Sequence, residues 1–193
     1  LLNKRRGFNL NDLYYCLHGC PVTERNHMFD AKLLKVAEEI LDELRATHLK
    51  VATAESCTGG LVAGCFTSIG GCSDVFERGW VTYSNLAKTE ELGVSEGILK
   101  QFGAVSAETA AGMVEGIFAH APVQIAFSVT GIAGPGGEQP GKPVGLVWFG
   151  VGVRGRKQET EKVIFNGDRN EIRMAAVAYG LQLILRALNS SSV

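Results

Sequence analysis

The string AESCTGG at 54–60 holds the residues whose types and spacing could do chemistry. It lies between a short apolar run that predicts a strand and an apolar segment from Leu61 that predicts a helix. Backbone N–H groups at a helix start have no intrahelical partners and carry partial positive charge. Ser56 could therefore attack a carbonyl carbon while these N–H groups stabilise the oxyanion. Alternatively, Ser56 or Thr58 is only the N-cap of the helix, and the residues alone favour this interpretation.

Cys57 is a second candidate nucleophile. A thiol is intrinsically more nucleophilic than a hydroxyl, and the start of a helix favours its thiolate form. Cys57 could also be a small buried apolar residue. The residues by themselves leave the choice between Ser56 and Cys57 open.

A serine nucleophile needs a base, and none of the four histidines stands in a motif. A lysine can replace histidine when burial lowers its pKa enough to leave a neutral amine. Lys88 follows the end of a predicted strand, where α/β proteins tend to build their sites. The residues alone would still make it a solvated surface lysine, since a Ser–Lys pair cannot be deduced from spacing.

Two further segments could bind a ligand. The glycine-rich loop at 131–137 could approach a phosphate or a ring. The near match to the Walker pattern at 136–142 is accidental, because Pro143 stands where that pattern needs Ser or Thr. Arg169 lies at the start of a predicted helix, where a positive charge is unfavourable. It could bind an anion, or it could pair with Asp168 or Glu171, and the sequence does not favour one of these alternatives over the other.

Helix and strand patterns alternate around these segments. Asp30, Asn85 and Ser106 are predicted helix N-caps, and Asp168 with Glu171 predicts a capping box for the last helix. Strands are predicted at 49–54, 80–83, 123–129, 144–153 and 158–165, and the last two should form a hairpin. The pattern predicts a single α/β domain, a three-layer α/β/α sandwich with a mixed β-sheet.

Regular periodicity begins only near Met28. Residues 1–27 are expected to be an N-terminal extension, disordered or non-native, ahead of a domain at 28–193. Cys16, His18, Cys20 and His27 could hold a metal, but the paired Cys-x-x-Cys arrangement of structural zinc sites is absent. We expect no metal site there.

Composition excludes several classes of function. The net charge is −1, with 19 basic and 20 acidic residues, so no basic excess indicates a nucleic-acid partner. No apolar run approaches the roughly 20 residues that cross a bilayer. The five cysteines lack the spacing of a disulfide framework. We expect reduced thiols and a cytoplasmic protein without a membrane partner.

Several strings, found in one order along the chain, resemble the CinA C-terminal domain family. They are TAESCTGG at 53–60, FERGWVTYSN at 76–85 followed by Lys88, GAVS at 103–106, SVTGIAGP at 128–135, KPVG at 142–145 and GDR at 167–169. The match runs from about Met28 to Leu188. Longer family members carry a separate N-terminal domain, so we expect the stand-alone form here, without a pyrophosphatase activity.

The resemblance implies a function. Characterised members hydrolyse the carboxamide of nicotinamide mononucleotide to nicotinic acid mononucleotide and ammonia, with a Ser–Lys mechanism and no metal or redox cofactor. Ser56 would be the nucleophile and Lys88 the base. Arg169 would suit the 5′-phosphate and Tyr83 the cationic ring. The other expected substrate-site residues are Thr130, Gly131, the weaker candidate Ser73, and the backbone of Cys57, Thr58 and Gly59.

The resemblance also favours a homodimer. Two other functional hypotheses remain beside the deamidase. One is a catalytically silent nucleotide-binding or regulatory module, which the family's competence and damage-inducible label allows. The other is an amidase for a different nucleotide or small amide.

Overall fold

The computed structural model of the chain describes residues 28–190. The chain divides into two units, Leu1–Asp30 and Ala31–Val193, and the fold below is that of the second unit. The predicted extension at 1–27, with its cysteines and histidines, lies outside the described residues. Within the described part, no helix combines the length and apolar character that a membrane span requires.

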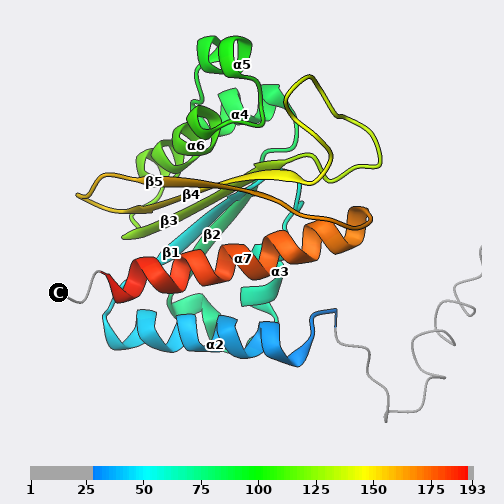
Figure 1. The fold of residues 1–193 in the computed structure, drawn as a ribbon. Helices are drawn as coiled ribbons and strands as arrows, with labels where there is room; N and C mark the ends of the chain where they lie inside the picture. Colours follow the sequence, from blue (N-terminus) through cyan, green and yellow to red (C-terminus); the bar gives the residue numbers. More distant parts are fainter. Residues whose placement is uncertain (1–27, 191–193) are drawn as a thin grey trace, which may run out of the picture. The chain divides into compact units, whose positions relative to one another are not determined.

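A five-stranded mixed sheet forms the middle layer (Figure 1). Its order is β2-β1-β3-β4-β5. β1 runs parallel to both β2 and β3, whereas β4 is antiparallel to β3 and to β5. The strands are β1 (Val51–Glu55), β2 (Phe76–Val81), β3 (Ile125–Gly131), β4 (Leu146–Val153) and β5 (Glu159–Ile164). The predicted mixed sheet and its final hairpin are therefore confirmed.

Helices cover both faces of this sheet (Figure 1). One layer holds α2 (Ala31–Ala46), α3 (Leu61–Thr67) and α7 (Arg169–Asn189), and the other holds α4 (Asn85–Leu92), α5 (Glu96–Phe102) and α6 (Ala107–His120). α6 packs against β1, β3 and β4, while α7 packs against β3 and β4 from the other side. The three-layer α/β/α prediction is confirmed.

The core between β1 and α6 explains why α4 lies where it does. Ala52 and Ala54 pack against Met113 and other apolar side chains of α6. Gly116 of α6 lies against the backbone of Leu92 at the end of α4, and a Cβ at this position would collide with the Leu92 carbonyl group. The close approach of α6 to α4 holds α4 over the ends of the parallel strands.

Most local capping signals were predicted correctly, whereas helix α5 and the start of β2 were not. The Ser106 cap and the Asp168–Glu171 capping box are both present. The cap of α4 is Ser84 rather than Asn85, because the Ser84 side chain accepts the Ala87 N–H. The seven-residue helix α5 was not predicted, because it buries a single apolar side chain, Leu99, and so shows no helical period. β2 begins at Phe76, earlier than predicted, because polar residues of an edge strand obscure its pattern.

Candidate active site

The carboxyl ends of β1, β2 and β3 meet at one edge of the sheet. Glu55 is in register with Val81 on one side and with Val129 on the other. Beyond the strand end, the Ser56 N–H donates to the Val129 carbonyl at 2.9 Å and the Thr82 N–H donates to the Glu55 carbonyl at 2.9 Å. The segments carrying the predicted site residues are thus joined by backbone hydrogen bonds.

Strand alternation decides which side chains share a face. Thr130 and Ser128 of β3 both point towards the layer of α4, α5 and α6, since their hydroxyls donate to the carbonyls of Ala104 and Ala110 at 2.7 Å each. Ser56 follows Glu55, which is in register with Val129, so it is level with Thr130, and its hydroxyl meets Lys88 of α4 in the same layer. Glu55, one residue earlier, faces α3 on the other side.

Lys88 meets Ser56 on the first of these faces. Its Nζ lies 3.0 Å from Ser56 Oγ, 2.7 Å from the Thr82 carbonyl oxygen and 3.4 Å from the Tyr83 carbonyl oxygen. The Lys88 side chain is fully buried, whereas Ser56 retains 8% exposure. The expectation of a solvated surface lysine is therefore wrong.

Burial lowers the pKa of Lys88 from 10.5 to about 8, because a charged ammonium loses its hydration there. A neutral amine has two N–H donors and one lone pair. The carbonyls of Thr82 and Tyr83 accept the two donors, which leaves the lone pair facing the Ser56 hydroxyl. This arrangement can take a proton from Ser56.

Cys57 lies next to this pair but is a poor nucleophile. Its side chain is 4% exposed, and burial raises the pKa of its thiol to about 12. A thiol with this pKa stays protonated near neutral pH, and the thiolate is the reactive form. The geometry and the two pKa values favour Ser56 over Cys57.

Glu55 occupies the start of α3. Its carboxylate accepts the N–H groups of Gly60, Val62 and Ala63 at 2.8–3.1 Å and the Thr58 hydroxyl at 2.6 Å. Glu55 thereby supplies the acceptor that the N-cap Gly60 lacks, since Gly60 has no side chain to accept a hydrogen bond.

The oxyanion donors expected from the sequence need correction. The N–H groups at the start of α3 bind Glu55, and the Gly59 N–H donates to the Ser56 carbonyl at 3.0 Å. Gly59 is therefore a turn residue rather than a donor to a ligand. Among the hydrogen bonds between backbone groups of residues 28–190, none engages the N–H of Cys57 or Thr58. Both N–H groups face the Cys57 thiol, whose pKa they lower in opposition to burial.

Tyr83 and Arg169 meet beside the Ser–Lys pair. Arg169 Nη2 donates to the Tyr83 hydroxyl at 2.9 Å, and Nη1 donates to the Gly134 carbonyl at 2.7 Å. Arg169 thus connects α7 to the segment after β2 and to the glycine-rich loop. Asp168 and Glu171 are engaged with each other's backbone in the capping box, so neither serves as its partner.

Ser73 is the one predicted site residue that the chain does not bring to this edge. It lies in the short helix η2 (Cys72–Asp74) before β2, whereas Ser56 follows the parallel strand β1. A strand rises about 3.3 Å per residue, so the six residues of β2 separate the two ends by about 20 Å. Within one chain, Ser73 therefore lies near the amino-terminal end of β2, whereas Ser56 lies at the carboxyl end of β1.

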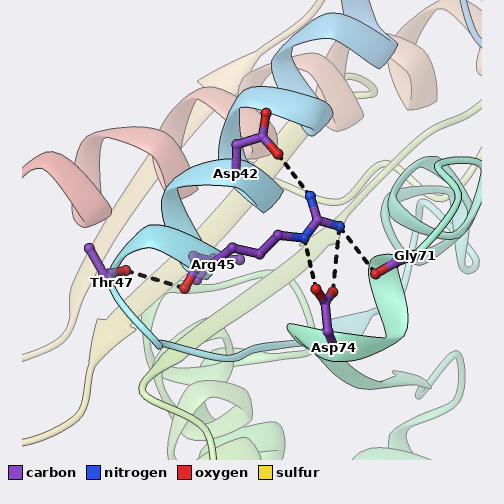
Figure 2. A network of polar contacts seen from close by, with 6 residues as sticks. Asp42, Arg45, Thr47, Gly71 and Asp74 are labelled. Atoms are coloured by element: carbon purple, nitrogen blue, oxygen red, sulfur yellow. Dashed lines mark hydrogen bonds and ion pairs between the residues drawn. The ribbon is translucent and has the colours of Figure 1, made fainter.

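The turn around Ser73 is fixed to α2 (Figure 2). Arg45 donates to Asp74 Oδ2 at 2.8 Å, to the Gly71 carbonyl at 3.1 Å and to Asp42 Oδ1 at 2.8 Å. The hydrogen bond from Arg45 lowers the pKa of Asp74. These contacts hold η2 away from the strand ends that carry Ser56.

Sequence reasoning missed Arg173. Its Nε donates to the Cys57 carbonyl at 3.2 Å and its Nη2 donates to the Thr58 carbonyl at 2.8 Å. The available signal was its position four residues after Arg169, since residues four apart lie on one face of a helix.

Within the described range, no three His, Cys, Asp or Glu side chains cluster as metal ligands would.

Comparison with known proteins gives consistent matches. The model of the CinA C-terminal domain matches residues 33–188. Nicotinamide-nucleotide amidohydrolase PncC of Enterobacter agglomerans is 46% identical over 159 residues, covering 82% of this chain and 97% of that protein. PncC of Escherichia coli K12 is 45% identical over 157 residues, covering 81% of this chain and 95% of that protein.

Longer relatives and solved structures match the same region. A CinA-like protein of Kosmotoga olearia is 49% identical over 79% of this chain, which spans only 38% of that relative's length. The crystal structure of competence/damage inducible protein CihA from Agrobacterium tumefaciens has a TM-score of 0.81 and 43% identity. The match covers 84% of this chain and 99% of that one.

Proposed function

The chain belongs to the CinA C-terminal domain family, and from this premise we propose that it is a nicotinamide-nucleotide amidohydrolase. It would hydrolyse the carboxamide of nicotinamide mononucleotide to nicotinic acid mononucleotide and ammonia. The relatives that it covers over nearly their whole length are named for this activity. The observation that carries the proposal is the buried Lys88 Nζ, 3.0 Å from Ser56 Oγ.

The first step is acylation of Ser56. Neutral Lys88 takes the hydroxyl proton as Ser56 Oγ attacks the amide carbon, and the amide C=O becomes a tetrahedral oxyanion. The N–H groups of Cys57 and Thr58 are the proposed donors to this oxyanion. Lys88, now an ammonium, gives its proton to the departing nitrogen. The nitrogen leaves as ammonia, and an acyl-serine ester remains on the enzyme.

The second step restores the enzyme. Water attacks the ester carbon while neutral Lys88 accepts one of its protons. This proton passes to Ser56 Oγ as the ester bond breaks, and the released carboxylic acid loses its own proton to solvent. The fixed carbonyls of Thr82 and Tyr83 hold the Lys88 amine in place through both proton transfers. No group beyond these residues and water is needed to balance the reaction.

Thr130 supports recognition of a carboxamide. Its hydroxyl hydrogen is committed to the Ala104 carbonyl, so its oxygen can only accept a further hydrogen bond. A carboxamide NH₂ can donate to such an oxygen, whereas the carboxylate product cannot. Arg169 and Tyr83 form the proposed contacts to the phosphate and the cationic ring.

The test is ammonia release from nicotinamide mononucleotide by the purified protein. Ser56→Ala and Lys88→Met should each lose at least about 10³-fold in kcat, since nucleophile and base act as one unit. Cys57→Ala and the exposed control Lys100→Met should retain activity. A folded Ser56→Ala variant with full activity would exclude the mechanism.

Two other outcomes would redirect the proposal. Release of ammonia from another amide in a panel, without turnover of nicotinamide mononucleotide, would assign a different substrate to the same site. Binding of the nucleotide in calorimetry without turnover by the wild type would favour a regulatory module.

The proposal extends to assembly and location. A homodimer is supported by three exposed apolar side chains near the site, Val81, Tyr83 and Leu86, which are 49%, 58% and 65% exposed. A cytoplasmic location is supported by the free thiols of Cys57, Cys65 and Cys72. Light scattering on the purified protein measures the first, and fractionation of cells measures the second.

A further inference from the structure

Arg173 holds two consecutive peptide carbonyls of the segment that follows Ser56. Nε and Nη2 belong to one side of the planar guanidinium group, and they donate to the Cys57 and Thr58 carbonyls respectively. Gly59 stays close to this guanidinium, since a Cβ there would lie 3.4 Å from Arg173 Nη2. The contact therefore fixes the direction of two peptide planes directly after the proposed nucleophile.

The orientation of a carbonyl determines the orientation of the next N–H. In a trans peptide, the C=O of one residue and the N–H of the next point in opposite directions. With the Cys57 carbonyl held by Arg173, the Thr58 N–H must point away from Arg173. The Gly59 N–H, paired in the same way with the Thr58 carbonyl, already binds the Ser56 carbonyl.

Arg173 and Lys88 reach this segment from different layers. Arg173 belongs to α7 on one side of the sheet, and Lys88 belongs to α4 on the other (Figure 1). A Thr58 N–H that points away from α7 is directed towards the side on which Lys88 Nζ meets Ser56 Oγ. An oxyanion formed on the carbon that Ser56 attacks would develop on this side.

We propose that Arg173 is a positioning residue that turns the Cys57–Thr58 peptide so that the Thr58 N–H serves the oxyanion. This inference rests on the proposed function, because it assigns a role within the same site. Arg173 acts through the peptide and does not touch the substrate. Its contribution belongs to the transition state, where the oxyanion exists, and not to substrate binding.

Lysine could not fill this role equally well. An ammonium is a single point of donors on a flexible stem, whereas the guanidinium presents a rigid planar fork that fits two neighbouring carbonyls. Glu55 already holds the start of α3 and the Thr58 hydroxyl, so the helix does not depend on Arg173 for its cap. Loss of Arg173 should therefore release one peptide rather than the whole element.

The test compares Arg173→Met with Arg186→Met, a matched control on the same helix whose guanidinium pairs with Glu161 on the sheet. At 20 °C, Arg173→Met should lower kcat for ammonia release about 10- to 100-fold, as expected for a misplaced oxyanion donor. KM should change less than about threefold, because ground-state binding is retained. Arg186→Met should leave both constants near the wild-type values.

A merely structural role predicts something different. It would lower the melting temperature of Arg173→Met but leave kcat unchanged while the protein is folded at 20 °C, and that result would overturn the inference. If Arg173→Met does not fold by circular dichroism, Arg173→Lys carries the same test, since it keeps the stem and the charge. Its kcat should fall with KM retained.

A second measurement separates this inference from the choice of substrate. A fluorophosphonate probe forms a bond between Ser56 Oγ and phosphorus, fluoride leaves, and Lys88 takes the hydroxyl proton. The labelling rate, followed by intact mass, should fall in Arg173→Met about as much as kcat and stay unchanged in Arg186→Met.

The possible results are distinct. Labelling that slows in Arg173→Met, with a wild type inactive on nicotinamide mononucleotide, would reject the substrate and support the inference. An active wild type with equal labelling and equal kcat in Arg173→Met would reject the inference and leave the function standing. A wild type that neither labels nor releases ammonia would reject both.

Discussion

The amine of Lys88 has three oxygen neighbours, and its protonation state decides what it does with them. As an ammonium it donates to all three, including Ser56 Oγ. As a neutral amine it keeps its donors on the carbonyls of Thr82 and Tyr83 and presents its lone pair to Ser56. Only the second state can accept the hydroxyl proton.

The rate of ammonia release should therefore rise with pH. Lys88 has a pKa of about 8 because burial disfavours its charge, so the neutral fraction increases through this pH and then saturates. Plots of log kcat/KM against pH should climb below about pH 8 and level above it. A midpoint near the ordinary lysine value, or no pH dependence between pH 6 and 10, would contradict the assignment of Lys88 as base.

At the scale of elements, the buried carboxylate of Glu55 orders the turn between β1 and α3. Glu55→Ala should leave three backbone N–H groups and the Thr58 hydroxyl without their acceptor. The free energy of unfolding should fall by about 3 kcal/mol, as for a lost charge-assisted network. Urea denaturation measures this, with the exposed Glu39→Ala as control, and equal midpoints would show that the network contributes little.

Glu55→Gln separates shape from hydrogen bonding. An amide oxygen can replace Oε2 and its three donors, but the NH₂ group then faces the Ala63 N–H, where no acceptor remains. The loss of stability should lie between those of the wild type and Glu55→Ala. A midpoint at or below that of Glu55→Ala would argue that the negative charge matters more than the geometry.

The elements differ in how far the sequence predicts them. Caps such as Ser106 and Asp168 depend on residues three apart, so local patterns identify them. The seven residues of α5 and the polar edge strand β2 lack a period strong enough to identify them. The role of Glu55 depends on the face of the sheet from which its side chain projects, because α3 begins on that face. No local pattern in the sequence contains that information.

The candidate site is less predictable than the fold, for the same reason. Ser56 and Lys88 are 32 residues apart and meet only because β1 and β2 are parallel and α6 holds α4 above their ends. Their pairing followed from the family resemblance and not from spacing. Arg173 contacts Thr58 from 115 residues away, and no local pattern in the sequence predicts this contact.

At the scale of the whole molecule, Ser73 raises a question of assembly. Within one chain, Ser73 lies at the opposite ends of the parallel strands from Ser56. A role for Ser73 in substrate binding therefore requires that a second copy of the chain supply it. In a symmetric dimer, each site would then combine Ser56 of one chain with Ser73 of the other. This links two expectations, the homodimer and the Ser73 contact, in one experiment.

Mixing two inactive variants tests that arrangement. Ser56→Ala and Ser73→Ala chains, unfolded together and refolded, should regain about a quarter of wild-type activity, since half the dimers form mixed pairs with one intact site. Each variant refolded alone provides the control. Full activity of Ser73→Ala alone would exclude Ser73 from the site, and a monomeric mass would exclude the shared arrangement.

The burial of Lys88 also has a consequence for the folding equilibrium. The unfolded chain holds the Lys88 proton up to a pKa near 10.5, whereas the folded protein releases it at about 8. Between these values the unfolded state binds more protons, so the free energy of unfolding should rise with pH by about 3 kcal/mol and lose this gain below pH 8. Urea titrations of wild type and Lys88→Met at pH 7.5 and 10.5 would isolate the effect, since other titrating groups are common to both. A stability difference independent of pH would mean that the buried amine is hydrated. If the difference does depend on pH, the burial that keeps Lys88 reactive as a base also makes the fold less stable near neutral pH.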